Sequence, residues 1–414
     1  MERRRVVVTG IGALTPIGHG ASGLWSGVRE GRCGIRVIDR FDTSQIQTKV
    51  AAQIDDFDPL AHFEPKLARR LDRFAQLALA ACEMALVDAR LSLDPKSPND
   101  RIGVTMGTAL GGVAGAEREH EKYIGGGLRA VDTSLALTVF GGSGSSSIAI
   151  RHGCMGPSNA NSNSCSSGAI AIGEAYRYIK EEYADVMIAA SAEAPLYELT
   201  FSSFTLIRTM SSNPDPRSAC RPFDRKRDGF VMGEAAAVLI MEELGYAVRR
   251  NAPIYCELLG YSCNNDAHHM VAPRPDGIAA LQVIAKALHD ARLTPEDIGY
   301  VNAHASSTSL NDRIETQVLK RAFGDRARTI PVSGTKAMHG HALGASGAVE
   351  AAICAMVFRH DYLPPTIHLE TPDPECDLDY IPNTGRSCRV DAILSTSFGF
   401  GGINAALVFG RYPA

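Results

Sequence analysis

Cys165 is the first residue whose type and surroundings could do chemistry. It lies in the octet NSNSCSSG at residues 161–168, directly before a stretch with the periodicity of a helix. A thiol at the start of a helix faces free N–H groups and the positive end of the helix dipole, which lower its pKa from about 8.5 towards neutrality. The octet alone fits a nucleophile and an inert buried cysteine equally well.

Two histidines in loops favour the nucleophile. His304 lies in VNAHASST and His341 in GTKAMHGHALGASG, and each stretch contains or follows a predicted strand. Loops at strand ends are where α/β sheets build their sites. One such histidine is more often structural, but two of them with a cysteine at a helix start indicate an active site. His339 and His341 could chelate a metal, yet no carboxylate or cysteine lies beside them at ligand spacing, so we predict no metal site.

The composition excludes several other classes of protein. The 414 residues are 45% hydrophobic and 21% charged, with a formal net charge of −4. This length predicts two domains or one large layered domain, and the charge offers nothing to attract nucleic acid or an anionic membrane. The start of the chain lacks the apolar core of a signal peptide, and apolar runs such as residues 235–241 are too short to span a bilayer. We therefore expect a cytoplasmic protein whose ten cysteines are reduced thiols.

The elements that must position these residues alternate along the chain. Predicted strands occupy residues 4–12, 101–112, 185–194, 235–244 and 254–262, and strands that run into loops occupy 298–307, 329–337 and 392–402. Predicted helices occupy residues 67–91, 166–184, 277–293 and 346–360. Strands alternating with helices indicate a layered α/β fold. The first strand runs into a glycine turn in GIGALTPIG, which lacks the third glycine of the dinucleotide fingerprint, so we expect no dinucleotide there.

The motifs occur together, and in this order, in one known family. NSCSSG, VNAHASST, GTKAMHGHALGASGAVEA and SFGFGGINA resemble the motif set of the β-ketoacyl-[acyl carrier protein] synthases, and the elongating, II-like branch resembles them most. The likeness extends over essentially the whole chain. It implies the thiolase fold, an α/β fold of two similar βαβαβαββ halves stacked as α-β-α-β-α layers. Residues 1–253 would form the half that carries the nucleophile, and residues 254–414 the half that carries the two histidines and the FGFGG loop.

The resemblance implies a decarboxylative Claisen condensation. Cys165 would take an acyl chain from its carrier, and a malonyl carrier would lose CO2 and extend that chain to give a 3-oxoacyl carrier. The N–H groups of Cys165 and Phe400 would form the oxyanion hole, and His304 and His341 would stabilise the malonyl enolate as neutral donors. Lys336 would order the site rather than act as a base.

The resemblance also implies supporting roles for other residues. Glu350 would pair with Lys336, and Asp312 and Glu315 would form an acidic pair after His304. Phe400 would gate the acyl pocket with Phe398 behind it, and Leu110 would tune the chain length. Ser306 and Thr308 would bind the pantetheine arm through their hydroxyls. The family usually has glycine where this chain has Ala305, so we expect a negative φ, or strain, at that position.

The implied partner is an acyl carrier protein, whose phosphopantetheine carries the substrates, so no free cofactor is expected. The protein would be a homodimer, or a heterodimer with a ketosynthase-like chain-length-factor subunit. Its pathway would be fatty acid elongation or, alternatively, a type II polyketide or polyene pathway. A thiolase is disfavoured because the last cysteine, Cys388, lies outside any glycine-rich loop, and a non-catalytic chain-length factor is disfavoured because the nucleophile, both histidines and the lysine are all present.

One strand could carry the choice of partner. Residues 158–164 read SNANSNS, and side chains alternate between the faces of a strand, so Asn159, Asn161 and Asn163 would point the same way. The resemblance places this strand at the two-fold axis of a dimer. Neighbouring loops of the same chain would satisfy the buried asparagines or, alternatively, a non-identical subunit would do so across an interface.

Overall fold

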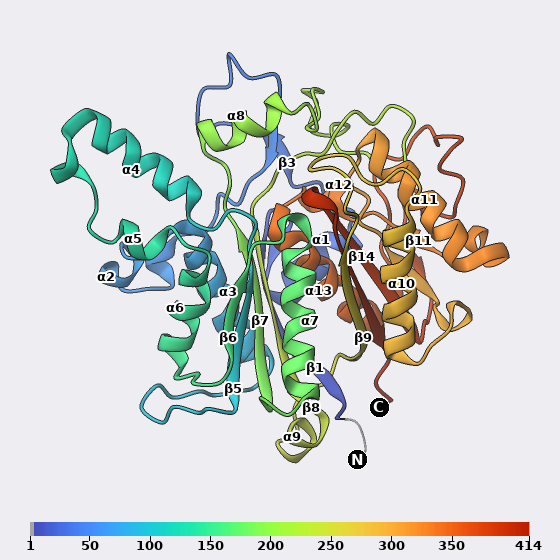
Figure 1. Cartoon of the computed structure of the whole chain (residues 1–414), viewed down its shortest axis with the longest axis horizontal. Coiled ribbons are helices and arrows are strands. Elements are labelled where there is room, and N and C mark those ends of the chain that lie inside the picture. Colours follow the sequence, from blue (N-terminus) through green and yellow to red (C-terminus); the bar gives the residue numbers. More distant parts are fainter. Residues whose placement is uncertain (1–3, 414) are drawn as a thin grey trace.

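The computed structural model describes residues 4–413, and its core consists of two halves with the same order of elements, βαβαβαββ (Figure 1). The first half contains β1 (Val6–Thr15), α3 (Arg73–Asp88), β5 (Ile102–Gly107), α6 (Gly142–His152), β6 (Ser158–Asn161), α7 (Ser167–Lys180), β7 (Val186–Glu193) and β8 (Ala235–Glu243). The second half contains β9 (Cys256–Asn265), α10 (Ile278–Ala291), β10 (Tyr300–Asn302), α11 (Ser309–Phe323), β11 (Val332–Ser333), α13 (Ser346–His360), β14 (Ala392–Gly399) and β15 (Ile403–Gly410). This order confirms the predicted fold class.

The strands also pair in the same pattern in both halves. Their order is β1-β8-β7-β5-β6 in the first half and β9-β15-β14-β10-β11 in the second. In each half the first strand pairs antiparallel with the last one. The other three strands of each half pair in parallel: β5 with β6 and β7, and β10 with β11 and β14. Residues 6–8 of β1 pair with residues 256–258 of β9, which joins the two halves into one sheet.

Alternation along the strands explains the layers. In β8, Leu239 and Met241 belong to the central core, whereas Val238 and Ile240 belong to the cluster under α3. A strand that is apolar on both faces is buried on both faces. Helix α3 accordingly covers the outer face of the first half, α10 and α11 cover that of the second half, and α7 and α13 lie between the two halves (Figure 1).

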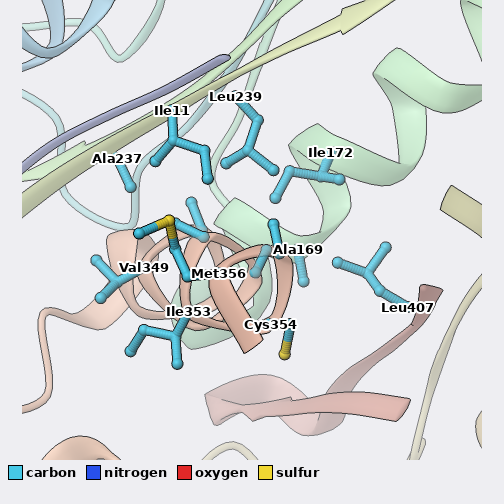
Figure 2. Close-up of a cluster of buried hydrophobic side chains, with 14 of the residues drawn as sticks. Ile11, Ala169, Ile172, Ala237, Leu239, Val349, Ile353, Cys354, Met356 and Leu407 are labelled. Atoms are coloured by element: carbon cyan, nitrogen blue, oxygen red, sulfur yellow. The ribbon is translucent and has the colours of Figure 1, made fainter. Parts of the chain in front are cut away.

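Helix α13 forms the middle of the central core. Figure 2 shows this helix among side chains from β1, α7, β8 and β15: Ile11, Ala169, Ile172, Ala237, Leu239 and Leu407. Thirteen of its 15 residues are buried, including the polar Ser346 and Glu350 near its N-terminal end. A helix packed so closely is a rigid support for those two polar side chains.

The first strand does not end in a turn, as the sequence predicted, but continues to Thr15. Helix α3 crosses this strand so closely that a Cβ at Gly10 would lie 2.4 Å from the carbonyl oxygen of Ala85, and a Cβ at Gly12 would lie 1.8 Å from that of Ala81. The two glycines therefore allow a helix to pack on the strand, and they are not part of a dinucleotide loop.

The helix predicted for residues 67–91 is also shorter in the structure. It begins at Arg73, because the carboxylate of Asp72 caps it by accepting from the N–H of Phe74. A separate short helix, α2 (Pro65–Ala68), precedes the cap.

Shorter elements occupy the connections: β2 (Gly18–His19), α1 (Gly20–Arg29), β3 (Ile35–Val37), β4 (Val50–Ala52), α4 (Val113–Gly126), α5 (Leu135–Thr138), α8 (Glu198–Leu206), α9 (Leu244–Arg249), α12 (Lys336–His339), β12 (Tyr362–Leu363) and β13 (Arg386–Ser387). In residues 4–413, no helix is both long enough and apolar enough to cross a membrane.

Candidate active site

Cys165 lies between β6 and the start of α7. A short 3-10 turn, Ser164–Ser166, links the two elements, and Ser164 enters it with a φ of +53°. The end of β14 passes beside this turn: a Cβ at Gly399 would lie 3.1 Å from the backbone nitrogen of Cys165, which leaves little room for any side chain there. The candidate nucleophile therefore lies at a helix start, as the sequence predicted.

The surroundings of this thiol do not lower its pKa in net terms, and here the prediction from the sequence is wrong. Burial raises the pKa of Cys165 and outweighs the groups that stabilise a thiolate. Those groups are the hydroxyl of Ser164, 3.7 Å from the sulfur, the backbone N–H of Phe400 and the charge of Lys336, while the charge of Glu193 acts against them. The side chain is therefore held as a thiol at neutral pH, with thiolate-stabilising groups already beside it.

One cavity brings the predicted residues together. It measures about 230 Å³, and Cys165, His304, His341, Phe398 and Phe400 line it. Further lining residues come from three segments, 208–209, 269–271 and 306–311: Arg208, Thr209, His269, Val271, Ser306, Thr308, Leu310 and Asn311. A larger cavity of about 1090 Å³ lies between α1, α3 and the end of α13, and no cysteine lines it. The smaller cavity is therefore the candidate active site.

A buried carboxylate fixes the backbone at His304. Glu315 accepts from the N–H of His304 through Oε1 and from the N–H of Ala305 through Oε2, both at 2.8 Å. Ala305 has a φ of +44°, so of the two expected alternatives, a negative φ or strain, the structure shows strain. The left-handed region costs an alanine about 1–2 kcal/mol, and each hydrogen bond to a charged group contributes about 1.5–3 kcal/mol. The two bonds to Glu315 therefore offset the strain.

Lys336 orients the ring of His304. This lysine is fully buried, and its Nζ bonds the carboxylate of Glu350 and the backbone carbonyl of His304. Nζ also lies 3.4 Å from Nδ1 of the His304 ring. An ammonium group can only donate, so the contact assigns the ring proton of His304 to Nε2. Burial raises the pKa of Glu350 to about 7, and the charge of Lys336 opposes that rise.

The second histidine is held by the central helix. Nδ1 of His341 lies 2.8 Å from the hydroxyl of Ser346, the first residue of α13. The rings of His304 and His341 are 5.4 Å apart and nearly perpendicular, at 80°. Burial lowers the pKa of both histidines well below the usual range, and the charge of Lys336 lowers it further. Both rings are therefore neutral at physiological pH, and each can offer one N–H to a substrate.

Phe400 borders the cavity and also an apolar cluster. Its ring centroid lies 6.5 Å from that of Phe230, which in turn lies 5.2 Å from that of His341. The cluster, which we call the aromatic cluster, contains Ile38, Phe41, Ile46, Ala51, Ala109, Leu110, Leu196, Phe201, Phe204, Met210, Phe230, Met232, Leu343 and Phe400. Leu110 thus packs against the same cluster as Phe400, and it does not line the cavity with Cys165. Phe398 lies beside His304, and the centroids of their rings are 6.0 Å apart.

Two hydroxyls and one carboxylate complete the predicted set. Ser306 and Thr308 line the cavity, and their hydroxyl oxygens are 2.9 Å apart. Asp312 lies outside the cavity, where it accepts from the N–H of Phe223 at 2.9 Å and faces Arg227 at 3.5 Å. Of the predicted acidic pair, Glu315 therefore holds His304 directly, whereas Asp312 fixes the loop before residue 227.

The two histidines that could chelate a metal have different surroundings. His341 lines the cavity, whereas His339 is buried elsewhere, with Nε2 3.1 Å from the hydroxyl of Thr335 and no partner for Nδ1. In the part of the chain that the structure describes, no three His, Cys, Asp or Glu side chains are grouped so that they could hold a metal ion.

The asparagine strand is shorter than predicted. Strand β6 ends at Asn161, because the chain turns at Ser164 to begin the 3-10 turn. Within the chain, Asn161 donates to the carbonyl of Ser167 at 3.2 Å, and Asn163 donates to Asn161 at 3.2 Å. Asn159 donates to Tyr178, but its buried Oδ1 has no partner.

Some buried groups at the site were not predicted from the sequence. Ser346, which holds His341, lies within the stretch GTKAMHGHALGASG, but no role was predicted for it. No role was predicted for Phe230 either, whose ring lies between those of His341 and Phe400. Glu193 is fully buried at the end of β7, and its charge acts on Cys165. The only signal for it in the sequence is a carboxylate at the end of the otherwise apolar run VMIAASAE.

Comparisons with known proteins agree with this geometry. The family model "Beta-ketoacyl synthase, N-terminal domain" matches residues 3–247, and "Beta-ketoacyl synthase, C-terminal domain" matches residues 255–370. The chain is 44% identical over 413 residues to a 3-oxoacyl-[acyl-carrier-protein] synthase 2 of Synechocystis, covering 100% of this chain and 99% of that protein. It is 39% identical over 413 residues to the protein of the same name from Staphylococcus aureus, covering 100% of both.

Solved structures give the same result. A ketosynthase in the AntDE:AntF complex, a type II PKS acyl-carrier protein with its ketosynthase, superposes with a TM-score of 0.92 at 33% identity, over 99% of this chain and 100% of that one. The ishigamide ketosynthase/chain length factor superposes with a TM-score of 0.91 at 33% identity, with the same coverage. Fold, cavity and matches over the full length agree, and the chain therefore belongs to the β-ketoacyl synthase family.

Proposed function

We propose that this chain is a 3-oxoacyl-[acyl-carrier-protein] synthase, an acyltransferase that condenses an acyl group on Cys165 with malonyl-carrier to give 3-oxoacyl-carrier, CO2 and free carrier. The observation that carries the proposal is the convergence of Cys165, His304 and His341 on one cavity, with Lys336 bonded behind His304. The names of the relatives at 39–44% identity support it.

The first half-reaction moves the acyl chain onto the protein. The sulfur of Cys165 attacks the thioester carbonyl, the bond to the sulfur of the carrier breaks, and the thiol proton leaves with the carrier thiol. The N–H groups of Cys165 and Phe400 stabilise the tetrahedral oxyanion, and the N–H of Phe400 already donates to the sulfur. A movement of the Phe400 side chain opens the aromatic cluster, with Leu110, to the acyl chain.

The second half-reaction makes the carbon–carbon bond. The bond between the malonyl carboxylate and its neighbouring carbon breaks, CO2 leaves, and the electron pair forms an enolate at the thioester. The Nε2–H of His304 and an N–H of His341 stabilise the enolate oxygen, which neutral imidazoles do without giving up a proton. The enolate carbon then attacks the acyl thioester, the bond to Cys165 breaks, and solvent returns a proton to its thiolate.

The proposed partner is an acyl carrier protein, and the hydroxyls of Ser306 and Thr308 at the cavity are assigned to its pantetheine arm. The higher identity to the 3-oxoacyl-carrier synthases favours fatty acid elongation over a type II polyketide or polyene pathway. The ishigamide structure, a ketosynthase/chain length factor, keeps the second pathway as the alternative. In either pathway we place the protein in the cytoplasm and assign it no free cofactor.

The open edge of the sheet is the proposed subunit interface. Strand β6 pairs only with β5 among the described strands, and the unpartnered Oδ1 of Asn159 lies on it. A homodimer, or a heterodimer with a chain-length-factor subunit, would pair the free backbone edge of β6 across the interface. The division of the chain into residues 1–253 and 254–414 stays a proposal; the two family models leave a gap at residues 248–254.

The test is a condensation assay with the purified protein. Acyl-carrier and malonyl-carrier labelled in its free carboxyl should give labelled CO2 and 3-oxoacyl-carrier in equal amounts, and Cys165→Ala should give no 3-oxoacyl product. Absence of that product from carriers with short, medium and long acyl chains would contradict the proposal. A single round of elongation without a second subunit supports fatty acid synthesis, whereas repeated rounds that need a second subunit support the polyketide alternative.

A further inference from the structure

Glu193 is a fully buried carboxylate beside the active site that the mechanism above does not use. It is the last residue of β7 and is 0% exposed. In residues 4–413 it has no ion pair with any lysine or arginine. A buried carboxylate without a cation is costly unless hydrogen bonds replace the water it has lost.

Four donors surround this carboxylate. Oε2 accepts from the N–H of Ala109 at 2.6 Å and from that of Gly344 at 3.1 Å. Oε1 accepts from the N–H of Leu110 and from the hydroxyl of Thr108, both at 3.1 Å. Burial raises the pKa of Glu193 to about 7, and these donors oppose the rise. Each oxygen already accepts two hydrogen bonds, so the ionised carboxylate is the form that fits.

The donors come from two segments that are far apart in the sequence. One is the loop after β5, which carries Leu110 into the aromatic cluster. The other is the turn Leu343–Ala345, which follows His341 and precedes α13. The two segments approach closely, because a Cβ at Gly344 would lie 2.3 Å from the nitrogen of Ala109 and 2.7 Å from Oε2 of Glu193. Leu343 also belongs to the aromatic cluster.

We propose that Glu193 is a positioning residue that fixes the distance between Leu110 and the turn after His341, and so sets which acyl chain lengths the enzyme accepts. Glu193 touches neither the acyl group nor the malonyl unit. It clamps two walls of the aromatic cluster into which the acyl chain extends. The inference rests on the proposed condensing function.

The decisive variant is Glu193→Gln. A glutamine keeps the volume of the side chain, but its amide NH2 faces a backbone N–H donor whichever way it is turned. At the Oε1 position it faces the N–H of Leu110, and at the Oε2 position it faces those of Ala109 and Gly344, so the loop after β5 or the turn Leu343–Ala345 must move. The assay compares long and short acyl-carriers at a fixed concentration of malonyl-carrier. The ratio of their kcat/KM values should differ by about tenfold between the variant and the wild type. This is the size expected for a change of about one methylene group in a pocket.

The matched control is Glu242→Gln at the other end of the same strand pair. Glu193 pairs with Ala235 at one end of β7 and β8, and Glu242 pairs with Val186 at the other end. Glu242 is equally buried and bonds Thr9 and Arg250, away from the site. Glu242→Gln should lower the melting temperature and leave the chain-length ratio unchanged. If Glu193→Gln acted only by weakening the structure, it too would leave that ratio unchanged.

If Glu193→Gln does not fold, Glu193→Asp decides. It keeps the charge but withdraws the carboxylate from both segments by about one methylene length, so it loosens the clamp and should also shift the ratio. A folded Glu193 variant with the wild-type ratio overturns this inference. A wild-type protein without condensing activity overturns the proposed function instead, so the two failures are distinct.

Discussion

Nζ of Lys336 lies 3.4 Å from Nδ1 of His304 and at the same time bonds the carboxylate of Glu350. All three side chains are buried, and Glu350 belongs to the central helix α13. The helix in the middle of the fold therefore fixes, through one lysine, which nitrogen of His304 carries the ring proton. This relationship predicts that the tautomer of His304, and with it the decarboxylation step, depends on the buried ion pair.

Lys336→Met should lower malonyl decarboxylation at least about tenfold, because the ring of His304 loses the donor that fixes its tautomer. It should also lower the free energy of unfolding by about 3–5 kcal/mol, because Glu350 is left buried without its partner. The double variant Lys336→Met with Glu350→Gln should recover much of the stability but not the activity. Release of labelled CO2 and urea denaturation measure the two effects. Recovery of both together would contradict the role of Lys336 in orienting His304.

His304→Ala and His341→Ala should each lower malonyl decarboxylation by about 10²-fold or more, the usual loss for one oxyanion donor. Transfer of the acyl group to Cys165 should decrease much less, because the hydroxyl of Ser164, the N–H of Phe400 and the charge of Lys336, rather than a histidine, stabilise a thiolate at Cys165. The two half-reactions are measured separately, as CO2 release and as acyl-enzyme formation. An equal collapse of both in His341→Ala would show that the histidines do not serve the malonyl step alone.

The sequence predicts those parts of the site that lie in contiguous motifs, and the structure brings Cys165, His304 and His341 to one cavity. Element types were also predictable, since α13 was expected at residues 346–360 and is Ser346–His360. The rest depends on packing between distant segments. The raised pKa of Cys165 comes from burial that no local pattern contains, and the four donors of Glu193 come from segments 83 to 151 positions away.

Alkylation of Cys165 by iodoacetamide should become faster as the pH rises to 9 and beyond, with no plateau near pH 7. Burial raises the pKa of this thiol, so the reactive thiolate remains a minor form at neutral pH. Mass spectrometry of residue 165 over time measures the rate. Cys263, which is exposed, is an internal control for a cysteine in water. A plateau below pH 7.5 would mean that the helix start dominates over burial.

Ala305→Gly should increase the free energy of unfolding by up to about 1.5 kcal/mol. Relief of the positive φ is worth about 1–2 kcal/mol, and the greater freedom of glycine in the unfolded chain removes about 0.5–1 kcal/mol of this gain. The control is Ala303→Gly, a buried neighbour without a positive φ, which should lose stability. Urea denaturation of the two variants compares them. Equal losses in both would show that Ala305 is not strained.

The central claim, that Cys165 carries the acyl chain, is tested most directly by the mass of the tryptic peptide of residues 152–177 after incubation with acyl-carrier. This peptide also contains Cys154, so fragmentation must locate the added group, and Cys154→Ala serves as the control. The account predicts one acyl mass on Cys165, its disappearance when malonyl-carrier is added, and the appearance of 3-oxoacyl-carrier in the same amount. An acyl group on another residue, or one on Cys165 that malonyl-carrier does not remove, would contradict it.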